Sequence, residues 1–130
     1  MSDAAWRHAA AREFQIDQRL SWHGTVVLTV AGDVDLYVAG ELKDRLAEAA
    51  DAGTKMLVLD FSDVTFVDSM GLGVLVGGMK RLRAAGGELH LVVSAPEVQR
   101  VLEITRMDRV IPLHETLADG LAAVGYRGPV

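Results

Sequence analysis

One serine of this chain stands where a reactive or modifiable hydroxyl could act, between a strand-like run and a helix-like run. The turn Asp68-Ser69-Met70-Gly71 follows the short apolar step at residues 64–67 and precedes a long stretch of helical periodicity. Backbone N–H groups at a helix start point outward and favour negative charge. Ser69 can therefore be interpreted as a helix cap, as a nucleophile or as an acceptor of phosphate.

The neighbours of Ser69 argue against a catalytic nucleophile. A serine hydrolase needs a base that accepts the serine proton and a third group that orients this base. The G-x-S-x-G elbow is absent, because Val67-Asp68 precedes the serine and Met70-Gly71 follows it. Only tertiary geometry could bring one of the four histidines to it: His8, His23, His90 or His114. We therefore expect no catalytic residue and no enzymatic activity.

The glycines that follow Ser69 do not complete a nucleotide-binding motif. The dinucleotide fingerprint requires G-x-G-x-x-G, but after Gly71 and Gly73 the third glycine position holds Val76. No Walker A run is present either. We interpret Gly73, Gly77 and Gly78 as small residues that let a helix lie close to the sheet, at some loss of helix propensity.

Aspartates near the predicted strand ends could converge on a metal ion, yet their spacing does not favour this. None has a histidine three or four residues away on one helix, and the calcium-loop pattern is missing. Each also has an ordinary role in a cap or a turn. We therefore expect no metal and no cofactor at these residues: Asp33, Asp35, Asp60, Asp63 and Asp68.

A phosphate on Ser69 is the remaining chemical interpretation. A hydroxyl at a helix start is accessible to a kinase, and the modification would add about −1.5 to −2 charges at pH 7. The helix N-terminus would tolerate that charge, whereas Asp68 would repel it. Any partner that docks over this turn would meet a bulky dianion. Capping and phosphorylation do not exclude one another.

The elements that must position this turn begin with two strands. Residues 14–20 alternate weakly, and residues 25–31 are rich in β-branched side chains. The Gly-containing turn Trp22-His23-Gly24 between them predicts an antiparallel hairpin. Residues 36–50 then have helical spacing, with Asp35 as a reasonable cap. Apolar residues 55–60 predict a strand buried on both faces of a sheet.

The remainder of the chain continues this alternation. After the helix that follows Ser69, residues 88–93 and 110–113 predict strands, and helices are expected to begin after Ser94 and Thr116. The order β-β-α-β-α-β-α-β-α predicts an α/β sandwich. We expect a mixed, mostly parallel sheet with an N-terminal antiparallel hairpin and about four helices.

Length and composition set the outer limits. The 130 residues suffice for one domain, which we place at residues 14–124 between a tail at 1–13 and a tail at 125–130. No apolar run approaches the roughly 18 residues of a membrane span. The net charge of −5, with scattered Lys and Arg, argues against nucleic-acid binding. The absence of cysteine and of a signal-peptide pattern is typical of a cytoplasmic protein.

Three segments together resemble the STAS domain family. The run Ala31-Gly32-Asp33-Val34-Asp35 is similar to the family's G-[ED]-[LV]-D signature after the second strand. Residues 58–73 are similar to its D-[LF]-S-x-V-x-F-x-D-S-x-G-L-G core, and residues 86–98 to its next strand and helix. The resemblance covers residues 14–124. In size, the chain resembles the bacterial anti-sigma-factor antagonists, the single-domain branch of the family.

This resemblance implies a partner-switching mechanism. The unmodified antagonist would bind an anti-sigma factor that is also a serine kinase of the histidine-kinase-like ATPase fold, and so release a sigma factor. Phosphorylation of the serine that matches Ser69 would end binding, and a PP2C-type phosphatase would reverse it. By the same resemblance Asp33, Asp35, Asp68 and Gly71 match positions at the docking surface.

One position departs from the family pattern. Many relatives carry a second Ser or Thr directly after the phosphorylated serine, where this chain has Met70. Ser69 is therefore the only hydroxyl of the turn, and an exposed apolar side chain is expected beside it, within the partner surface. An alternative from another class remains open: small STAS proteins also occur as unphosphorylated accessory subunits of lipid-transport ABC systems.

Overall fold

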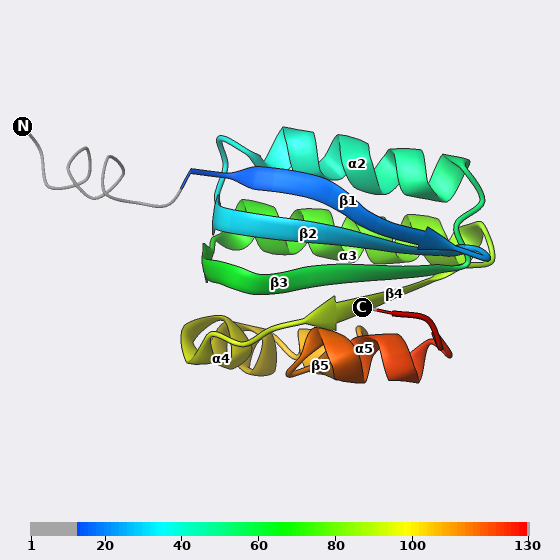
Figure 1. The fold of residues 1–130 in the computed structure, drawn as a ribbon. Helices are drawn as coiled ribbons and strands as arrows, with labels where there is room; N and C mark the ends of the chain where they lie inside the picture. The colour runs from blue at the N-terminus through cyan, green and yellow to red at the C-terminus, as the bar shows by residue number, and fades with distance from the viewer. Residues whose placement is uncertain (1–12, 130) are drawn as a thin grey trace, which may run out of the picture.

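A single five-stranded sheet organises the computed structural model, which describes residues 13–129; the tail predicted at residues 1–13 lies almost wholly outside them. The strand order is β1-β2-β3-β4-β5, with β1 antiparallel to β2 and every other pair parallel (Figure 1). This confirms the predicted mixed, mostly parallel sheet. The strands are β1 Gln15–Trp22, β2 Thr25–Val34, β3 Met56–Val67, β4 Glu88–Val92 and β5 Leu113–His114.

The hairpin of β1 and β2 closes as the sequence predicts. Trp22 pairs with Thr25, so the loop consists of His23 and Gly24 alone. Both loop residues have positive φ angles, 47° and 85°. Two-residue hairpin loops with positive φ at both positions match the right-handed twist of the strands, and glycine adopts this conformation without strain.

Among residues 13–129, four helices complete the sandwich, as predicted. Apolar side chains alternate along the strands, so Leu28 and Val30 join a large core with α2, α3 and α4, whereas Val27 joins a smaller one with α5 and Tyr126. In Figure 1, α2 and α3 lie side by side behind the sheet. The helices are α2 Ala39–Asp51, α3 Ser69–Ala84, α4 Pro96–Ile104 and α5 Leu117–Ala123. Among residues 13–129, no helix is both long enough and apolar enough to span a membrane.

Two element boundaries differ from the sequence prediction. The helix predicted over residues 36–50 begins only at Ala39, because the Asp35 side chain accepts a hydrogen bond from Tyr37 N at 3.0 Å and forms a turn there. The N-cap of this helix is Val38, so the prediction that Asp35 caps it was wrong. The last strand was predicted over residues 110–113 but spans Leu113–His114. A 3-10 turn at Met107–Arg109 precedes it, and the chain becomes extended only after this turn.

A pair of histidines links β4 to β5. The imidazole rings of His90 and His114 stack nearly parallel, and His90 Nδ1 lies 3.0 Å from His114 Nε2. One of these nitrogens must accept a proton that the other carries, so the hydrogen bond requires at least one neutral ring. Burial lowers the pKa of His90, and the charge of His114 lowers it further, while Glu88 acts in the opposite direction.

This pair predicts a loss of stability on mild acidification. Because the folded pKa of His90 lies below its unfolded value of about 6.5, the unfolded chain binds more protons as the pH falls below that value. The melting temperature should therefore drop between about pH 7.5 and about pH 5.5. In His90→Gln the drop should be smaller, whereas the exposed His23→Asn variant should keep it. Equal drops in wild type and His90→Gln would contradict this assignment.

Candidate functional site

The carboxyl ends of β2 and β3 bring Ser69 and the five residues of the predicted partner surface to one end of the molecule. Asp33 pairs with Phe66 across the two strands, and Asp68 N donates to Val34 O at 3.1 Å. Asp35 follows β2 directly, while α3 begins at Ser69. Parallel strands end at the same edge of a sheet, which is why segments some 30 positions apart in sequence meet here.

Asp68 ties these two segments together. Its Oδ1 atom accepts a hydrogen bond from Gly71 N at 2.9 Å, and its Oδ2 atom accepts one from Leu36 N at 2.9 Å. Asp68 is therefore the N-cap of α3, and the interpretation of Ser69 as that cap was wrong. The carboxylate uses both oxygens, so it fixes the start of α3 and the loop after β2 at once.

Replacing Asp68 should loosen this link. Asp68→Ala leaves two backbone donors without their acceptor and is expected to lower the free energy of unfolding by about 1–2 kcal/mol. Asp68→Asn retains one acceptor oxygen and should lose less. Urea unfolding measures both values, and Asp17→Ala on exposed β1 serves as the control. A loss in Asp68→Ala no larger than in Asp17→Ala would contradict the role of the carboxylate.

Ser69 presents its hydroxyl to solvent at the first position of α3. The residue is exposed, and no hydrogen bond to its hydroxyl is formed by residues 13–129. His90 and His114 bond to each other, and His23 occupies the hairpin turn, so none of these three serves Ser69 as a base. His8 lies outside the described residues. Among the described residues, Ser69 is therefore an exposed hydroxyl without a histidine base.

Gly71 allows α3 to begin directly against the sheet. A Cβ atom there would lie 2.9 Å from Val34 Cγ1, Val34 O and Val67 Cγ1, which is closer than van der Waals contact permits. The other glycines of α3 correct the sequence interpretation. Gly78 packs against Leu46 of α2 rather than the sheet, and a Cβ on either Gly73 or Gly77 would meet nothing within 4 Å.

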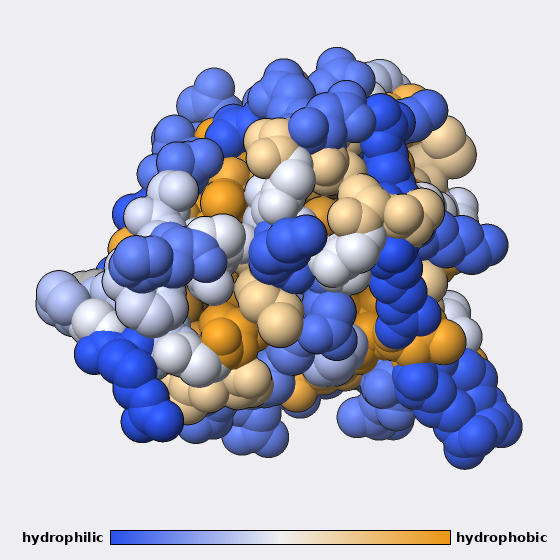
Figure 2. Space-filling model, turned by 90° about the vertical axis from the view of Figure 1, so that its right-hand side faces the viewer, coloured by the Kyte–Doolittle hydropathy of each residue, from blue (hydrophilic) through white to orange (hydrophobic). Residues whose placement is uncertain are grey.

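Exposed apolar side chains surround the turn. Met70 is 56% exposed, as the sequence predicted, and Leu36, Tyr37 and Phe66 are 57%, 77% and 50% exposed. At the opposite end of the molecule, hydrophilic side chains break up the apolar surface (Figure 2). Sequence analysis missed these three residues, because it placed Leu36 and Tyr37 inside a helix and treated Phe66 as part of a strand. Apolar surface gathered around one hydroxyl suits protein docking.

The aspartates that were considered as metal ligands have other roles in the structure. Asp60 is buried in β3, where its Oδ1 atom accepts hydrogen bonds from Ser62 N at 3.0 Å and Ser62 Oγ at 2.5 Å. Asp68 is engaged as a cap. Within the described part of the chain, no three His, Cys, Asp or Glu side chains are grouped as a metal site requires.

Comparison with known proteins gives consistent results. The family model described as STAS domain matches residues 18–120. The anti-sigma-B factor antagonist of Bacillus subtilis is 32% identical over 88 residues, which cover 68% of this chain and 80% of that relative. An anti-sigma factor antagonist from Mycobacterium paratuberculosis has a crystal structure with 28% identity and a TM-score of 0.75, covering 86% of this chain and 92% of that one.

A third protein shares the fold. The Bacillus cell fate determinant SpoIIAA, solved in its phosphorylated form, superposes with a TM-score of 0.66 at 22% identity, over 86% of this chain and 99% of that one. The fold of this chain is thus one that has been observed experimentally.

Proposed function

This chain belongs to the STAS domain family, and we propose that it is an anti-sigma-factor antagonist whose binding is ended by phosphorylation of Ser69. The relatives named above, from Bacillus subtilis and Mycobacterium paratuberculosis, are an anti-sigma-B factor antagonist and an anti-sigma factor antagonist. One observation in the chain itself carries the proposal: an exposed serine hydroxyl at a helix start, bordered by exposed apolar side chains and, within residues 13–129, without a histidine base.

The physical argument rests on where a phosphate would sit. The amino end of the 16-residue helix α3 stabilises negative charge, so the modified protein can keep its fold. A partner that covers Leu36, Tyr37, Phe66 and Met70 would have to remove water from the same dianion. Burying an unpaired charge costs several kcal/mol, which is enough to dissociate an ordinary complex.

The remaining roles follow from this surface. We assign Asp33, Asp35 and Met70 to partner contact, and Asp68 and Gly71 to holding the loop after β2 against α3. The partner is an anti-sigma factor that acts as a serine kinase of the histidine-kinase-like ATPase fold, and a PP2C-type phosphatase removes the phosphate. The chain itself is a binding protein without catalysis and works in the cytoplasm. The two relatives named above are antagonists, so they favour this function over the alternative of a transporter accessory subunit.

Phosphate mapping tests the proposal. The Ser69→Ala variant, which cannot be modified, serves as bait to capture the anti-sigma factor in the presence of ATP. The captured protein is then incubated with wild-type chain and ATP, and the modified residue is located by mass spectrometry. We expect one phosphate, on Ser69, and none on the half-buried Ser62. Modification at another residue, or no modification, would refute the switch.

A further inference from the structure

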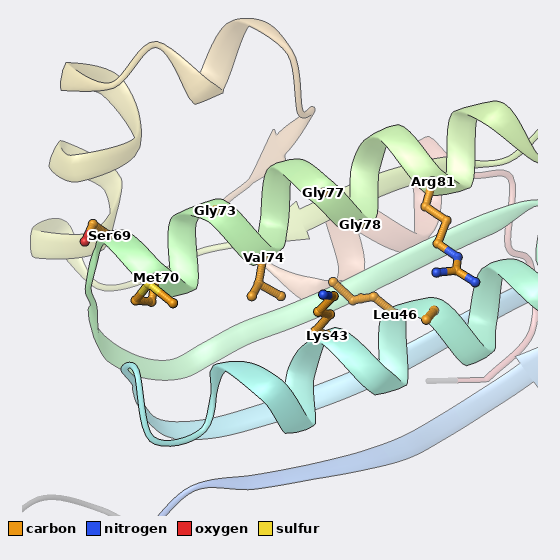
Figure 3. Close-up of a pocket in the computed structure, with 10 residues that line it drawn as sticks. Lys43, Leu46, Ser69, Met70, Gly73, Val74, Gly77, Gly78 and Arg81 are labelled. Carbon is orange, nitrogen blue, oxygen red and sulfur yellow. The ribbon is translucent and has the colours of Figure 1, made fainter.

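A groove runs along the molecule from the Ser69 turn, between α2 and α3 (Figure 3). It has a volume of about 450 Å³ and is lined by ten residues, of which only Lys43, Ser69 and Arg81 are polar or charged. Sites that bind a ligand or a partner side chain are similarly concave and mostly apolar. The groove lies beside the proposed switch and extends beyond the end surface on which the proposed function rests.

Two glycines in the groove are not required by close neighbours among residues 13–129. Gly71 and Gly78 are required by close neighbours, but Cβ atoms on Gly73 and Gly77 would meet nothing within 4 Å. Each glycine in a helix interior is unfavourable relative to alanine. Because they stand four positions apart, they lie on one face of α3 and leave its backbone bare along the groove. This arrangement lets another backbone approach α3 closely.

Charge indicates what the groove accepts. The chain carries a net charge of −5, yet the ten lining residues include two cations and no acid. Arg81 is paired with Asp51 at 2.9 Å, whereas Lys43 forms no ion pair with any residue of the described range 13–129. In Figure 3 the Lys43 side chain rises from α2 toward Val74 of α3. An apolar occupant with a carboxylate would therefore complement the groove.

The dimensions favour a helix as that occupant. Ser69 and Arg81 lie twelve positions apart on α3, which corresponds to about 18 Å, the length of about three helical turns. We infer that the groove binds an amphipathic helix of the partner, with its apolar face against Gly73 and Gly77 and an acidic side chain at Lys43. The inference rests on the proposed function in taking the anti-sigma factor as this partner.

Matched variants test the groove. Gly77→Leu fills it and favours the helix, whereas Ala122→Leu places the same side chain at an exposed position of α5, outside the lining residues. Calorimetric titration of the full-length chain with the captured anti-sigma factor should show binding at least about 10-fold weaker for Gly77→Leu and within about 2-fold of wild type for Ala122→Leu. Thermal unfolding checks that both variants fold.

Charge reversal supplies an independent measurement. Lys43→Glu should weaken binding several-fold, and more at low salt, while Lys80→Glu outside the groove should not. If Ser69→Asp weakens binding but Gly77→Leu and Lys43→Glu bind like wild type, the groove inference alone is wrong. If the wild-type chain binds no anti-sigma factor, the proposed function fails, and the groove inference fails with it.

Cross-linking identifies the occupant directly. The chain has no cysteine, so Ala47→Cys introduces a single site in the groove for a benzophenone label. We expect cross-links to partner residues spaced three or four positions apart on one amphipathic segment. Cross-links between two copies of this chain, or to partner residues without helical spacing, would overturn the inference.

Discussion

Ser69→Asp is expected to weaken binding of the anti-sigma factor at least about 100-fold, which corresponds to about 2.7 kcal/mol. The introduced carboxylate lies at the start of α3, next to the Asp68 carboxylate and beside exposed Met70. An interface that covers this apolar surface must strip water from the new charge without supplying a partner for it. Phosphoserine carries more charge and should weaken binding further.

Ser69→Ala is the matched control for this experiment. It removes the acceptor hydroxyl without adding charge, and that hydroxyl has no hydrogen bond among residues 13–129. Its affinity should stay within about 3-fold of wild type, because deleting an exposed, unpaired group leaves no buried donor. Affinities are best measured without ATP, so that wild-type Ser69 stays unmodified. Equal affinities of the alanine and aspartate variants would show that charge at this turn is not the switch.

Gly71→Ala is expected to lower the free energy of unfolding by about 2 kcal/mol. The added Cβ would press on the Val34 carbonyl oxygen and on buried Val34 and Val67 side chains, so the first turn of α3 must move away from the sheet. That movement also strains the hydrogen bond from Gly71 N to Asp68 Oδ1. Gly71→Ala should therefore also loosen the loop after β2, which is held by the hydrogen bond from Leu36 N to Asp68.

Gly73→Ala, the same substitution two residues along α3, should act in the opposite direction. Its Cβ meets nothing within 4 Å, so only the gain in helix propensity remains, about 0.5–1 kcal/mol. Urea denaturation of both variants against wild type measures the contrast. Two losses of similar size would mean that glycine serves one general purpose in this helix, contrary to the different surroundings of the two positions.

The first turn of α3 thus combines residues that stabilise the fold with residues of the proposed switch. The hydrogen bond between Asp68 and the buried Gly71 determines where the helix starts, whereas Ser69 and Met70 are exposed to solvent. A phosphate on Ser69 can therefore change the surface without disturbing the bonds that hold it in place. This separation is what a reversible switch in a small domain requires.

Local pattern in the sequence determined the order of strands and helices, the hairpin and the position of the Ser69 turn. These depend on side-chain periodicity and on turn residues such as His23-Gly24, which act over a few neighbours. The long motif around Ser69 also sufficed to indicate the family. The grouping of Asp33, Asp35, Asp68 and Gly71 into one surface came from the same resemblance, and these residues lie together in the structure because parallel strands end at a common edge.

Only the tertiary structure decided which neighbours each residue meets. Asp68 and Ser69 are both residue types that commonly cap helices. Asp68 is the cap because its backbone is still extended at the end of β3 and its side chain accepts from Gly71 N, whereas Ser69 is already helical. Four glycines of α3 look alike in sequence, yet two fill close contacts and two face an open groove. The contact between His90 and His114 joins separate strands. Such differences arise from packing between segments far apart in the chain, which no local pattern encodes.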